Sequence, residues 1–330
     1  MANSSLKNRI LGISPVIEIA VRHFYWKNRK TVEKFRKKFS GKTPKTVKSG
    51  ESTDKVVCSE NDFTDVVKHI EKQCIDKGDS IILHSSFGSL KKFGMSPEQV
   101  IAAFIHMLGE SGTLSMPAMP VIRNAPKMDS YLNNDGDDSQ VYRYSVKSKR
   151  VKTGALGAAI LNDSECVRSL HPINTLASIG WHAHYIMKDN IEKDDNLPCG
   201  KNSSWYKCAE LNSLIVGLGI DLTHSLTMIH VAEDARKGGW PVKKWYRKKN
   251  FVVDNHGIES THTFDERRPS WGTLHFAERT LCRDLVKARI LHTTIVHGIV
   301  VEYMRSKELL EFLASKNDKG YPYFFTGKMS

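Results

Sequence analysis

The 330-residue sequence lacks several signatures that would assign a function directly. Its six cysteines are scattered without close pairs, which argues against a disulfide framework or a zinc site and favours a reducing compartment. It has no apolar run of about 18 residues and no signal-peptide pattern, so we expect a cytoplasmic protein. It also has no GxGxxG, P-loop or GxSxG motif, which disfavours nucleotide-fold dehydrogenases, ATPases and serine hydrolases.

Acidic residues are scarce at the beginning of the chain. The first 50 residues hold 13 Lys or Arg against only Glu18 and Glu33, a net charge of +11 out of +13 for the whole chain. The rest is therefore almost neutral, at +2. The basic balance is weak evidence for nucleic-acid binding by the main body, and we expect no nucleic-acid partner.

Residues 14–39 predict a basic amphipathic helix, the main part of a leader over residues 1–40. Ser14 and Pro15 are typical of a helix start, and apolar residues then recur at helical spacing among lysines and arginines. The leader either binds an anionic membrane surface, as a peripheral protein of the inner face would, or packs on its own chain or on a partner such as a second subunit of a homodimer. Residues 41–55 predict a linker and residues 56–330 the compact domain.

The body predicts α/β architecture, because helices alternate with short apolar strands. We expect helices over 63–74 and 96–109, strands over 81–84 and 113–117, and a buried strand in 211–221 leading into a helix at 227–234. The polar residues 123–150 predict a long loop or lid. A strand over 296–303 and a helix over 305–316 follow near the end.

His230 and Glu233 lie one turn apart in "TMIHVAED" and so share a helix face. By its spacing alone this pair fits a solvated ion pair better than a general base with its orienting carboxylate. Two further segments are equally open. "HSSFGSL" places Ser85 and Ser86 where hydroxyl and N–H groups could hold a phosphate or an amide, although such loops commonly only turn the chain. In "VRSLHPINTL", His171 could line a site or belong to a structural loop.

Taken together, six segments in order resemble the aminoglycoside 3-N-acetyltransferase family of antibiotic N-acetyltransferases. They are "LHSSFGSL" (83–90), "GTLSMPA" (112–118), "KTGALGAAI" (152–160), "VRSLHPINTLASIG" (167–180), "LIVGLGID" (214–221) and "TMIHVAED" (227–234). The resemblance covers roughly residues 60–315. It implies a three-layer α/β fold with a mixed sheet, distinct from the common acetyltransferase superfamily.

The resemblance also implies an N-acyltransferase that uses acetyl-coenzyme A or another acyl-coenzyme A and needs no metal. His230 would be the general base for the acceptor amine, and Glu233 would orient it. The residues implied to hold coenzyme A or its thioester oxygen are Ser85, Ser86, Arg168, Ser169, His171, Thr175 and Thr227.

Charge predicts a different acceptor from the family name. Aminoglycosides are polycations that would be attracted by clustered carboxylates, whereas the segment "PVKKWYRKKN" is basic and aromatic. We therefore expect a nucleotide-linked amino sugar destined for surface polysaccharide, bound by Trp240, Lys243, Lys244 and Trp245, unless this segment is a solvated turn. The alternatives are an aminoglycoside acceptor, conferring antibiotic resistance, and a non-catalytic scaffold that binds membrane or nucleic acid.

Overall fold

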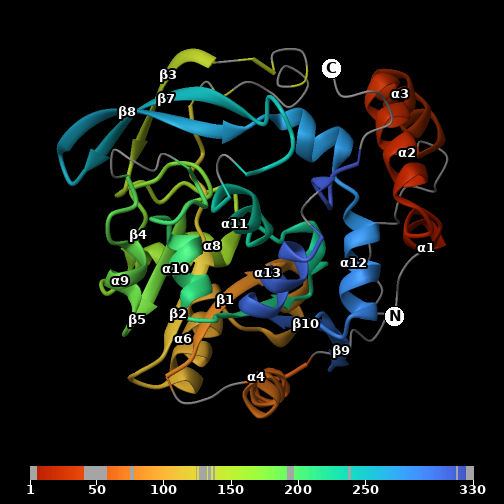
Figure 1. The fold of residues 1–330 in the computed structure, drawn as a ribbon. Coiled ribbons are helices and arrows are strands. Elements are labelled where there is room, and N and C mark those ends of the chain that lie inside the picture. The colour runs from red at the N-terminus through yellow and green to blue at the C-terminus, as the bar shows by residue number, and fades with distance from the viewer. Residues whose placement is uncertain are drawn as a thin grey trace.

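The structure is a computed structural model (Figure 1). It describes residues 6–40, 58–74, 78–123, 125, 132, 135–136, 138–191, 197–236, 239–316 and 319–324. The predicted linker at 41–55 lies outside these ranges, as does part of the predicted loop at 123–150.

A seven-stranded mixed sheet forms the centre of the body. Its order is β4 (Val167–Arg168), β5 (Leu176–Gly180), β2 (Thr113–Pro117), β1 (Ser80–Ser85), β6 (Leu214–Leu218), β10 (Ile299–Arg305) and β9 (His292–Val296). Strand β1 runs parallel to β2 and β6, whereas β4, β5, β9 and β10 pair antiparallel. The apolar runs predicted as strands at 81–84, 113–117 and 214–218 are thus neighbours at the middle of the sheet.

Helices cover both faces of this sheet, because successive side chains of a strand point to opposite sides. Ile81 and Leu83 belong to one apolar core, whereas Ile82 belongs to the other. The first core packs under α4 (Glu60–Cys74), α6 (Pro97–Leu108) and α8 (Ala155–Ala159), and the second under α10 (Ser204–Glu210), α11 (Ile229–Asp234), α12 (Glu278–Lys287) and α13 (Ser306–Ala314). The predicted three-layer α/β class is confirmed.

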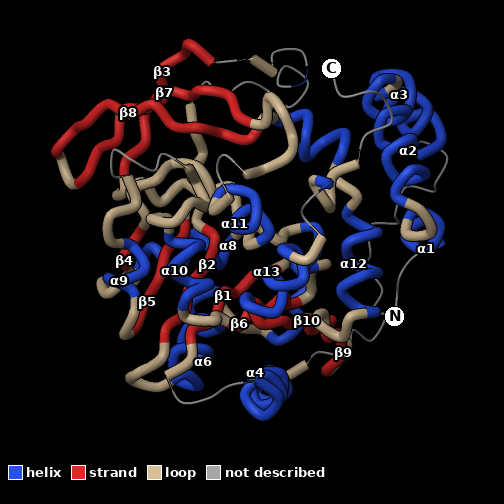
Figure 2. The backbone as a smooth tube through the Cα atoms, viewed as in Figure 1, coloured by secondary structure: helices blue, strands red, loops and turns tan. Residues whose placement is uncertain are grey.

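A second sheet of three strands, in the order β3-β7-β8, lies beside the large one and appears at the top of Figure 2. Its strands are β3 (Asp138–Ser145), β7 (Tyr246–Asn255) and β8 (Ile258–Arg267), and it has an apolar core of its own. Strand β3 corrects part of the predicted loop at 123–150. The remaining short helical segments are α5 (Phe87–Leu90), η1 (Lys91–Phe93), η2 (Ile160–Asn162), α9 (Ala183–Met187), η3 (Leu222–His224) and η4 (Trp271–His275).

The leader forms three helices, α1 (Leu6–Leu11), α2 (Pro15–Lys27) and α3 (Arg29–Ser40), rather than one. Helix α2 packs on η4 and α12, and α1 also lies against α12 (Figure 1). Glu18 and Ile19 on the inner face of α2 are fully buried. The inner face of α2 therefore packs on its own chain, which was one of the two interpretations of the leader. None of the helices in the described part of the chain has the length and apolar run needed to span a bilayer.

Glu18 caps the beginning of α12 from the leader. Its carboxylate accepts hydrogen bonds from the backbone N–H of Arg279 at 2.9 Å and of Thr280 at 3.2 Å. A buried carboxylate there satisfies free N–H groups and faces the positive end of the helix dipole. We expect Glu18→Ala to lower the free energy of unfolding by about 1 kcal/mol in urea titrations. Glu33→Ala, which removes a half-exposed pair with Arg29, is the control; equal losses would contradict the capping role.

Candidate active site

A cavity of about 1010 Å³ lies between the carboxyl ends of the central strands and the second sheet. The ends of β1 and β2 line it through His84, Ser85, Met116 and Pro117, and β7 and β8 line another side. Its other walls include the loop at 172–174, residues 119–122, Lys152, the segment leading into α11, the beginning of α12 and one leader residue, Arg22. A typical pocket for one small ligand is at most about 1,000 Å³. This cavity thus lies at the upper end of that range.

His230 and Glu233 form a hydrogen-bonded pair in the wall of this cavity. Both residues line it, and the His230 Nδ1 to Glu233 Oε2 distance is 3.0 Å. The Glu233 side chain is 2% exposed and that of His230 is 16% exposed. An ionised carboxylate only accepts hydrogen bonds, so Nδ1 must carry the proton. Nε2 is left with its lone pair, and an imidazole held in this way can take up a proton there.

The charges around the pair keep the imidazole neutral and the carboxylate ionised. Burial, and then the nearby Arg267 cation, lower the pKa of His230, although Glu233 acts in the opposite direction. Burial would raise the pKa of Glu233, but His230, Arg267 and a hydrogen bond from Tyr323 outweigh it and hold the pKa below its usual value. The pair is therefore a neutral base beside a stable anion at neutral pH.

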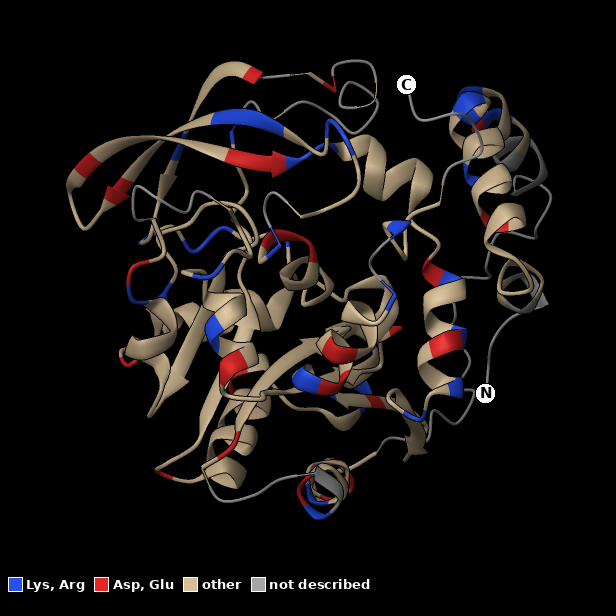
Figure 3. Ribbon diagram, viewed as in Figure 1, with Lys and Arg blue, Asp and Glu red and all other residues tan. Residues whose placement is uncertain are grey.

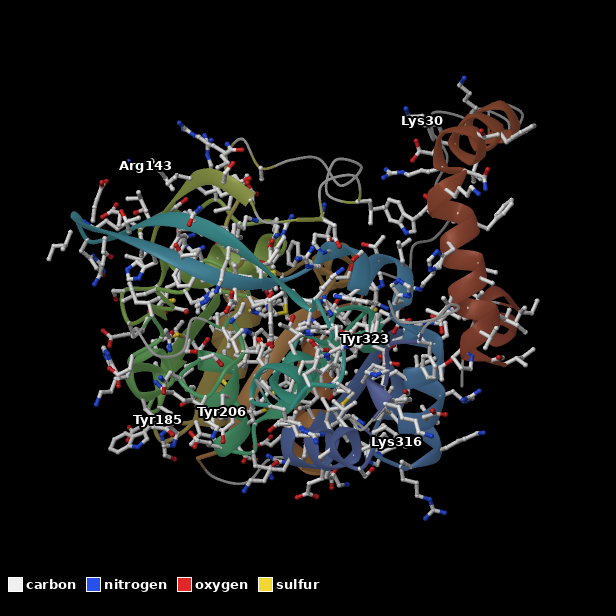
Figure 4. The ribbon with its side chains drawn as sticks, turned by 45° about the horizontal axis from the view of Figure 1, so that its top comes forward. Lys30, Arg143, Tyr185, Tyr206, Lys316 and Tyr323 are labelled. Atoms are coloured by element: carbon white, nitrogen blue, oxygen red, sulfur yellow. The ribbon has the colours of Figure 1, made fainter. Side chains whose placement is uncertain are left out.

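Arg267 and Tyr323 come from distant parts of the chain and contact the His230–Glu233 pair. The Tyr323 hydroxyl donates to Glu233 Oε1 at 2.6 Å, and Arg267 donates in turn to that hydroxyl. Arg267 Nη1 also lies 3.3 Å from His230 Nδ1, a contact we interpret as electrostatic because Nδ1 already donates to Glu233. Figure 4 shows Tyr323 inside the body, away from the protein surface. Sequence reasoning missed both residues, which no local pattern links to His230.

A second buried carboxylate adjoins the pair. Asp234 lines the cavity and accepts hydrogen bonds from the Tyr246 hydroxyl at 2.9 Å and from the backbone N–H of Cys199 at 3.0 Å. Burial, together with the Glu233 charge, raises its pKa to about 7. Asp234 therefore exchanges its proton near neutral pH, whereas Glu233 does not.

A comparison with known protein families identifies the family of this chain. The family model described as aminoglycoside 3-N-acetyltransferase matches residues 82–316, which include most of β1, His230 and Arg267. The chain belongs to this family. The resemblance inferred from the six segments, the antibiotic N-acetyltransferase fold and the class of acyl-coenzyme A-dependent N-acyltransferases are thereby confirmed. Arg22 and Tyr323 lie outside the matched range.

Solved structures of aminoglycoside acetyltransferases have the same fold at low sequence identity. The structure of AAC(3)-Xa aligns with a TM-score of 0.63 and 18% identity over 78% of this chain and 92% of its own. AAC-IIIb, in a binary structure with CoASH, aligns with a TM-score of 0.62 and 16% identity over 80% and 98%. A mutant of AAC(3)-IVa in complex with a gentamicin gives 0.57 and 18% over 76% and 86%. No curated protein sequence matches this chain.

In this aminoglycoside 3-N-acetyltransferase family member, only some of the residues predicted to hold coenzyme A line the cavity. Ser85, at the end of β1, and Thr227, one turn before His230, both line the cavity. The others predicted are not among the residues that line it: Ser86, Arg168, Ser169, His171 and Thr175. Their part in binding coenzyme A stays a prediction that this geometry does not support.

These other residues are engaged within the protein. The Arg168 guanidinium donates to the backbone carbonyls of Ala118 at 2.6 Å and Val146 at 3.4 Å, and also to that of Ser148. The Ser169 hydroxyl accepts from the backbone N–H of His171, and the Thr175 hydroxyl donates to the His171 carbonyl. The Ser86 backbone N–H donates to the Leu218 carbonyl. Arg168 thus joins three backbone segments instead of reaching the cavity.

The predicted acceptor-binding residues also lie away from the cavity. Trp240 and Trp245 pack in an aromatic cluster, with Trp245 stacked on Trp271 at a centroid distance of 5.5 Å. Lys243 and Lys244 are exposed in the turn before β7 and are absent from the cavity lining. The alternative of a solvated turn describes both lysines, and the predicted binding of a nucleotide-linked sugar by these tryptophans is not supported.

The rest of the basic segment is paired with carboxylates across the β7–β8 hairpin (Figure 3). Arg247 stands opposite Glu266 in the register and pairs with it at 2.5 Å, and Lys249 reaches the same carboxylate at 3.3 Å. Lys248 pairs with Asp265 at 2.6 Å. The run of positive charge read from the sequence therefore does not persist in the fold.

Two other basic side chains line the cavity, His84 and Lys152, and neither was among the predicted site residues. Burial lowers the pKa of His84 to about 4, and its Nε2 has no hydrogen-bond partner within the described ranges. Burial, and then the charge of Lys249, lower the pKa of Lys152.

Within the parts of the chain that the structure describes, no group of three or more His, Cys, Asp or Glu side chains is arranged to hold a metal ion.

Proposed function

We propose that this chain transfers an acetyl group from acetyl-coenzyme A, or another acyl group from its thioester, to an amine of an aminoglycoside-type amino sugar. The observation that carries this proposal is the buried Glu233 holding His230 in the wall of a cavity of about 1010 Å³. The family, and the CoASH and the gentamicin in the solved structures named above, support the choice of both substrates.

His230 is the general base of the proposed reaction. The amine nitrogen attacks the thioester carbonyl carbon while Nε2 accepts an amine proton, and Glu233 stabilises the imidazolium that forms. The carbon–sulfur bond of the tetrahedral intermediate then breaks, and the coenzyme A thiolate leaves and recovers the proton from His230. The products are the amide and free coenzyme A, without a covalent enzyme intermediate and without a metal.

Ser85 and Thr227 are the proposed contacts for the thioester end of coenzyme A. Both carry a hydroxyl donor, and both line the same cavity as His230. Hydroxyl donors placed where the oxyanion develops stabilise the tetrahedral intermediate. The adenosine and phosphate groups are left without assigned partners.

The acidic side chains of the cavity suit a polycationic acceptor. Asp234, Glu266 and Glu278 line it in addition to Glu233. Ammonium groups of an aminoglycoside would find hydrogen-bond acceptors there, and amines not acetylated would remain paired. Of the basic segment that favoured an anionic acceptor, Lys243 and Lys244 do not line the cavity, and Lys249, which does, is paired with Glu266.

A nucleotide-linked amino sugar for surface polysaccharide is the second candidate acceptor. Lys152 and Lys249 both line the cavity, and burial and then the charge of Lys249 lower the pKa of Lys152. An anionic group such as a diphosphate would relieve this repulsion. An aminoglycoside would thus bind to the carboxylates of the cavity, whereas a nucleotide-linked sugar would bind to its lysines.

Thiol release from acetyl-coenzyme A separates the candidates. One series uses gentamicin or kanamycin as acceptor, and another uses nucleotide-linked amino-deoxysugars. Turnover with the aminoglycosides supports the first candidate, and turnover with the nucleotide sugars alone supports the second. Absence of turnover in both series, with an intact fold by circular dichroism, would contradict the proposed function and favour the non-catalytic scaffold.

The pH dependence of turnover follows from the lowered pKa of His230. The base must be neutral, and its pKa lies below the ordinary value of about 6.5 because of burial and Arg267. We expect the fall in kcat/KM that is due to His230 to lie below about pH 6.5, apart from any change near pH 7 that Asp234 causes in acceptor binding. The pH profile is measured with two acceptors whose amines have different pKa values. A limb that stays at the same pH with both acceptors belongs to the enzyme and not to the substrate. An enzyme limb above pH 7 would contradict the assignment.

We propose a cytoplasmic enzyme that attaches peripherally to the inner face of the membrane through residues 14–39. The leader's exposed face supports the attachment, and the free state of the cysteines that the structure describes agrees with a reducing compartment. The alternative is that this face contacts a second copy of the chain in a homodimer. The experiment described below therefore also measures the oligomeric state of the protein.

A further inference from the structure

Helix α2 of the leader has two faces with different surroundings. Val16, Ile17, Ala20, Val21 and Phe24 fall within an arc of about 140° at 100° per residue. All five are exposed, Val16 by 61% and Phe24 by 65%. Ile13, which precedes the helix, adds another exposed apolar side chain. A soluble helix normally turns such a stripe toward a core, so a partner is expected on this face.

The opposite face of α2 belongs to the catalytic body. Glu18 caps α12, and Ile19 is fully buried. Arg22 pairs with Glu278 at 3.0 Å, and both residues line the cavity. His224, another lining residue, lies 3.1 Å from the same carboxylate of Glu278. The helix therefore cannot turn its apolar stripe inward without dismantling part of the cavity wall.

Positive charge adjoins the exposed stripe. Residues 27–38 contain seven Lys or Arg and a single acidic residue, Glu33. Lys27 follows the stripe at the end of α2, and Lys30 and Lys34 are exposed on α3. Figure 4 shows Lys30 at the outer end of the leader, away from the body, and Figure 3 shows further blue along α3.

We propose that the outer face of α2, with the lysines at and beyond its end, binds an anionic phospholipid membrane while its inner face holds the cavity wall. Apolar side chains inserted beside lysines match the acyl boundary and the anionic headgroups of such a surface. A second copy of this chain fits less well, because it would bring two strongly basic leaders together. Attachment and catalysis then use opposite faces of one helix.

Vesicle flotation of the full-length protein tests this proposal without any substrate. Vesicles of phosphatidylcholine with phosphatidylglycerol are compared with vesicles of phosphatidylcholine alone, and we expect binding only to the former, weakened by salt. The triple variant Lys27→Gln, Lys30→Gln and Lys34→Gln should bind on the order of 100-fold more weakly. Val16→Ser with Phe24→Ser should lose at least roughly tenfold.

Matched variants elsewhere on the surface serve as controls. Lys147→Gln, Lys149→Gln and Lys307→Gln make the same change of net charge at exposed positions, and Ile258→Ser removes an apolar side chain that is 75% exposed. These controls should bind vesicles like the wild type. Thermal unfolding of every variant verifies the fold, so the result does not depend on whether acetyl transfer is found.

Three results would overturn the proposal. The first is the absence of binding to phosphatidylglycerol vesicles at low salt. The second is equal binding to both vesicle types, unaffected by the lysine substitutions. The third is a dimer in analytical ultracentrifugation that the Val16→Ser and Phe24→Ser changes dissociate, which would assign the face to a second copy. Deleting the leader is a poorer test, because it removes Glu18 and Arg22 as well.

Discussion

Replacing His230 by alanine is expected to lower kcat/KM for acetyl transfer about 1,000-fold. General base catalysis contributes roughly 100- to 10,000-fold. The other imidazole beside a carboxylate at the cavity is His224, which lies next to Glu278. Its side chain is 72% exposed, and the hydrogen bond to Glu278 raises its pKa, so it is less suited than His230 to act as a neutral base. Coenzyme A affinity should change little, because the proposed role of His230 is toward the amine. Single-turnover thiol release measures the first quantity, and calorimetric titration with coenzyme A measures the second.

His106→Ala is the matched control for this variant. His106 is exposed on α6 and does not line the cavity, so its loss should leave kcat/KM unchanged. Full turnover by the His230→Ala protein would show that another group takes the proton. An equal loss in both variants would point to a general effect of removing an imidazole.

The catalytic pair could be predicted from sequence because it is local. A separation of three residues on a helix brings His230 and Glu233 together whatever the rest of the chain does. The central strands were predictable for a similar reason, since β1, β2 and β6 are short apolar runs buried on both faces. Six short segments in order were then enough to suggest the family, and with it the fold.

The environment of the pair could not be predicted in the same way. Tyr323 reaches Glu233 across 90 positions, and Arg267 reaches His230 across 37. Contacts at such separations are set by how the sheets pack, which no local period encodes. The same holds for Arg22, which comes to the cavity only because α2 docks on α12.

The basic segment was misinterpreted because its charges were counted as a run instead of along a strand. In β7, Arg247, Lys249, Phe251 and Val253 alternate with more exposed residues, so the first two point inward with the aromatic core. Inward charges of this kind need partners, and Glu266 on β8 supplies one for both. The alternation was visible in the sequence; the identity of the pairing strand was not.

Tyr323→Phe is expected to lower kcat roughly 10- to 100-fold with little change in the KM for coenzyme A. Hydrogen bonds to charged groups contribute about 1.5–3 kcal/mol, and the Tyr323 hydroxyl donates one to the carboxylate that orients the base. The phenylalanine keeps the ring in its aromatic cluster, so packing is preserved. Tyr323 is a positioning residue in this account, because it acts on Glu233 and not on the substrate.

The pH profile distinguishes this role from a general loss of structure. In the wild type, His230, Arg267 and Tyr323 outweigh burial and keep the pKa of Glu233 low. Without the hydroxyl, the carboxylate is satisfied less and attracts the imidazolium form of His230 more strongly, which raises the pKa of His230. A base with a higher pKa is protonated at higher pH, so the acid limb of kcat/KM should move upward.

Tyr321→Phe supplies a control from the same short segment. The Tyr321 hydroxyl donates to Asp284 at 3.1 Å, and neither residue lines the cavity. Its loss removes a hydrogen bond to a carboxylate of the same kind, so any effect on stability should be similar in the two variants. Only Tyr323→Phe should move the acid limb. If both variants lower kcat equally and neither moves the limb, the end of the chain stabilises the fold without tuning the base.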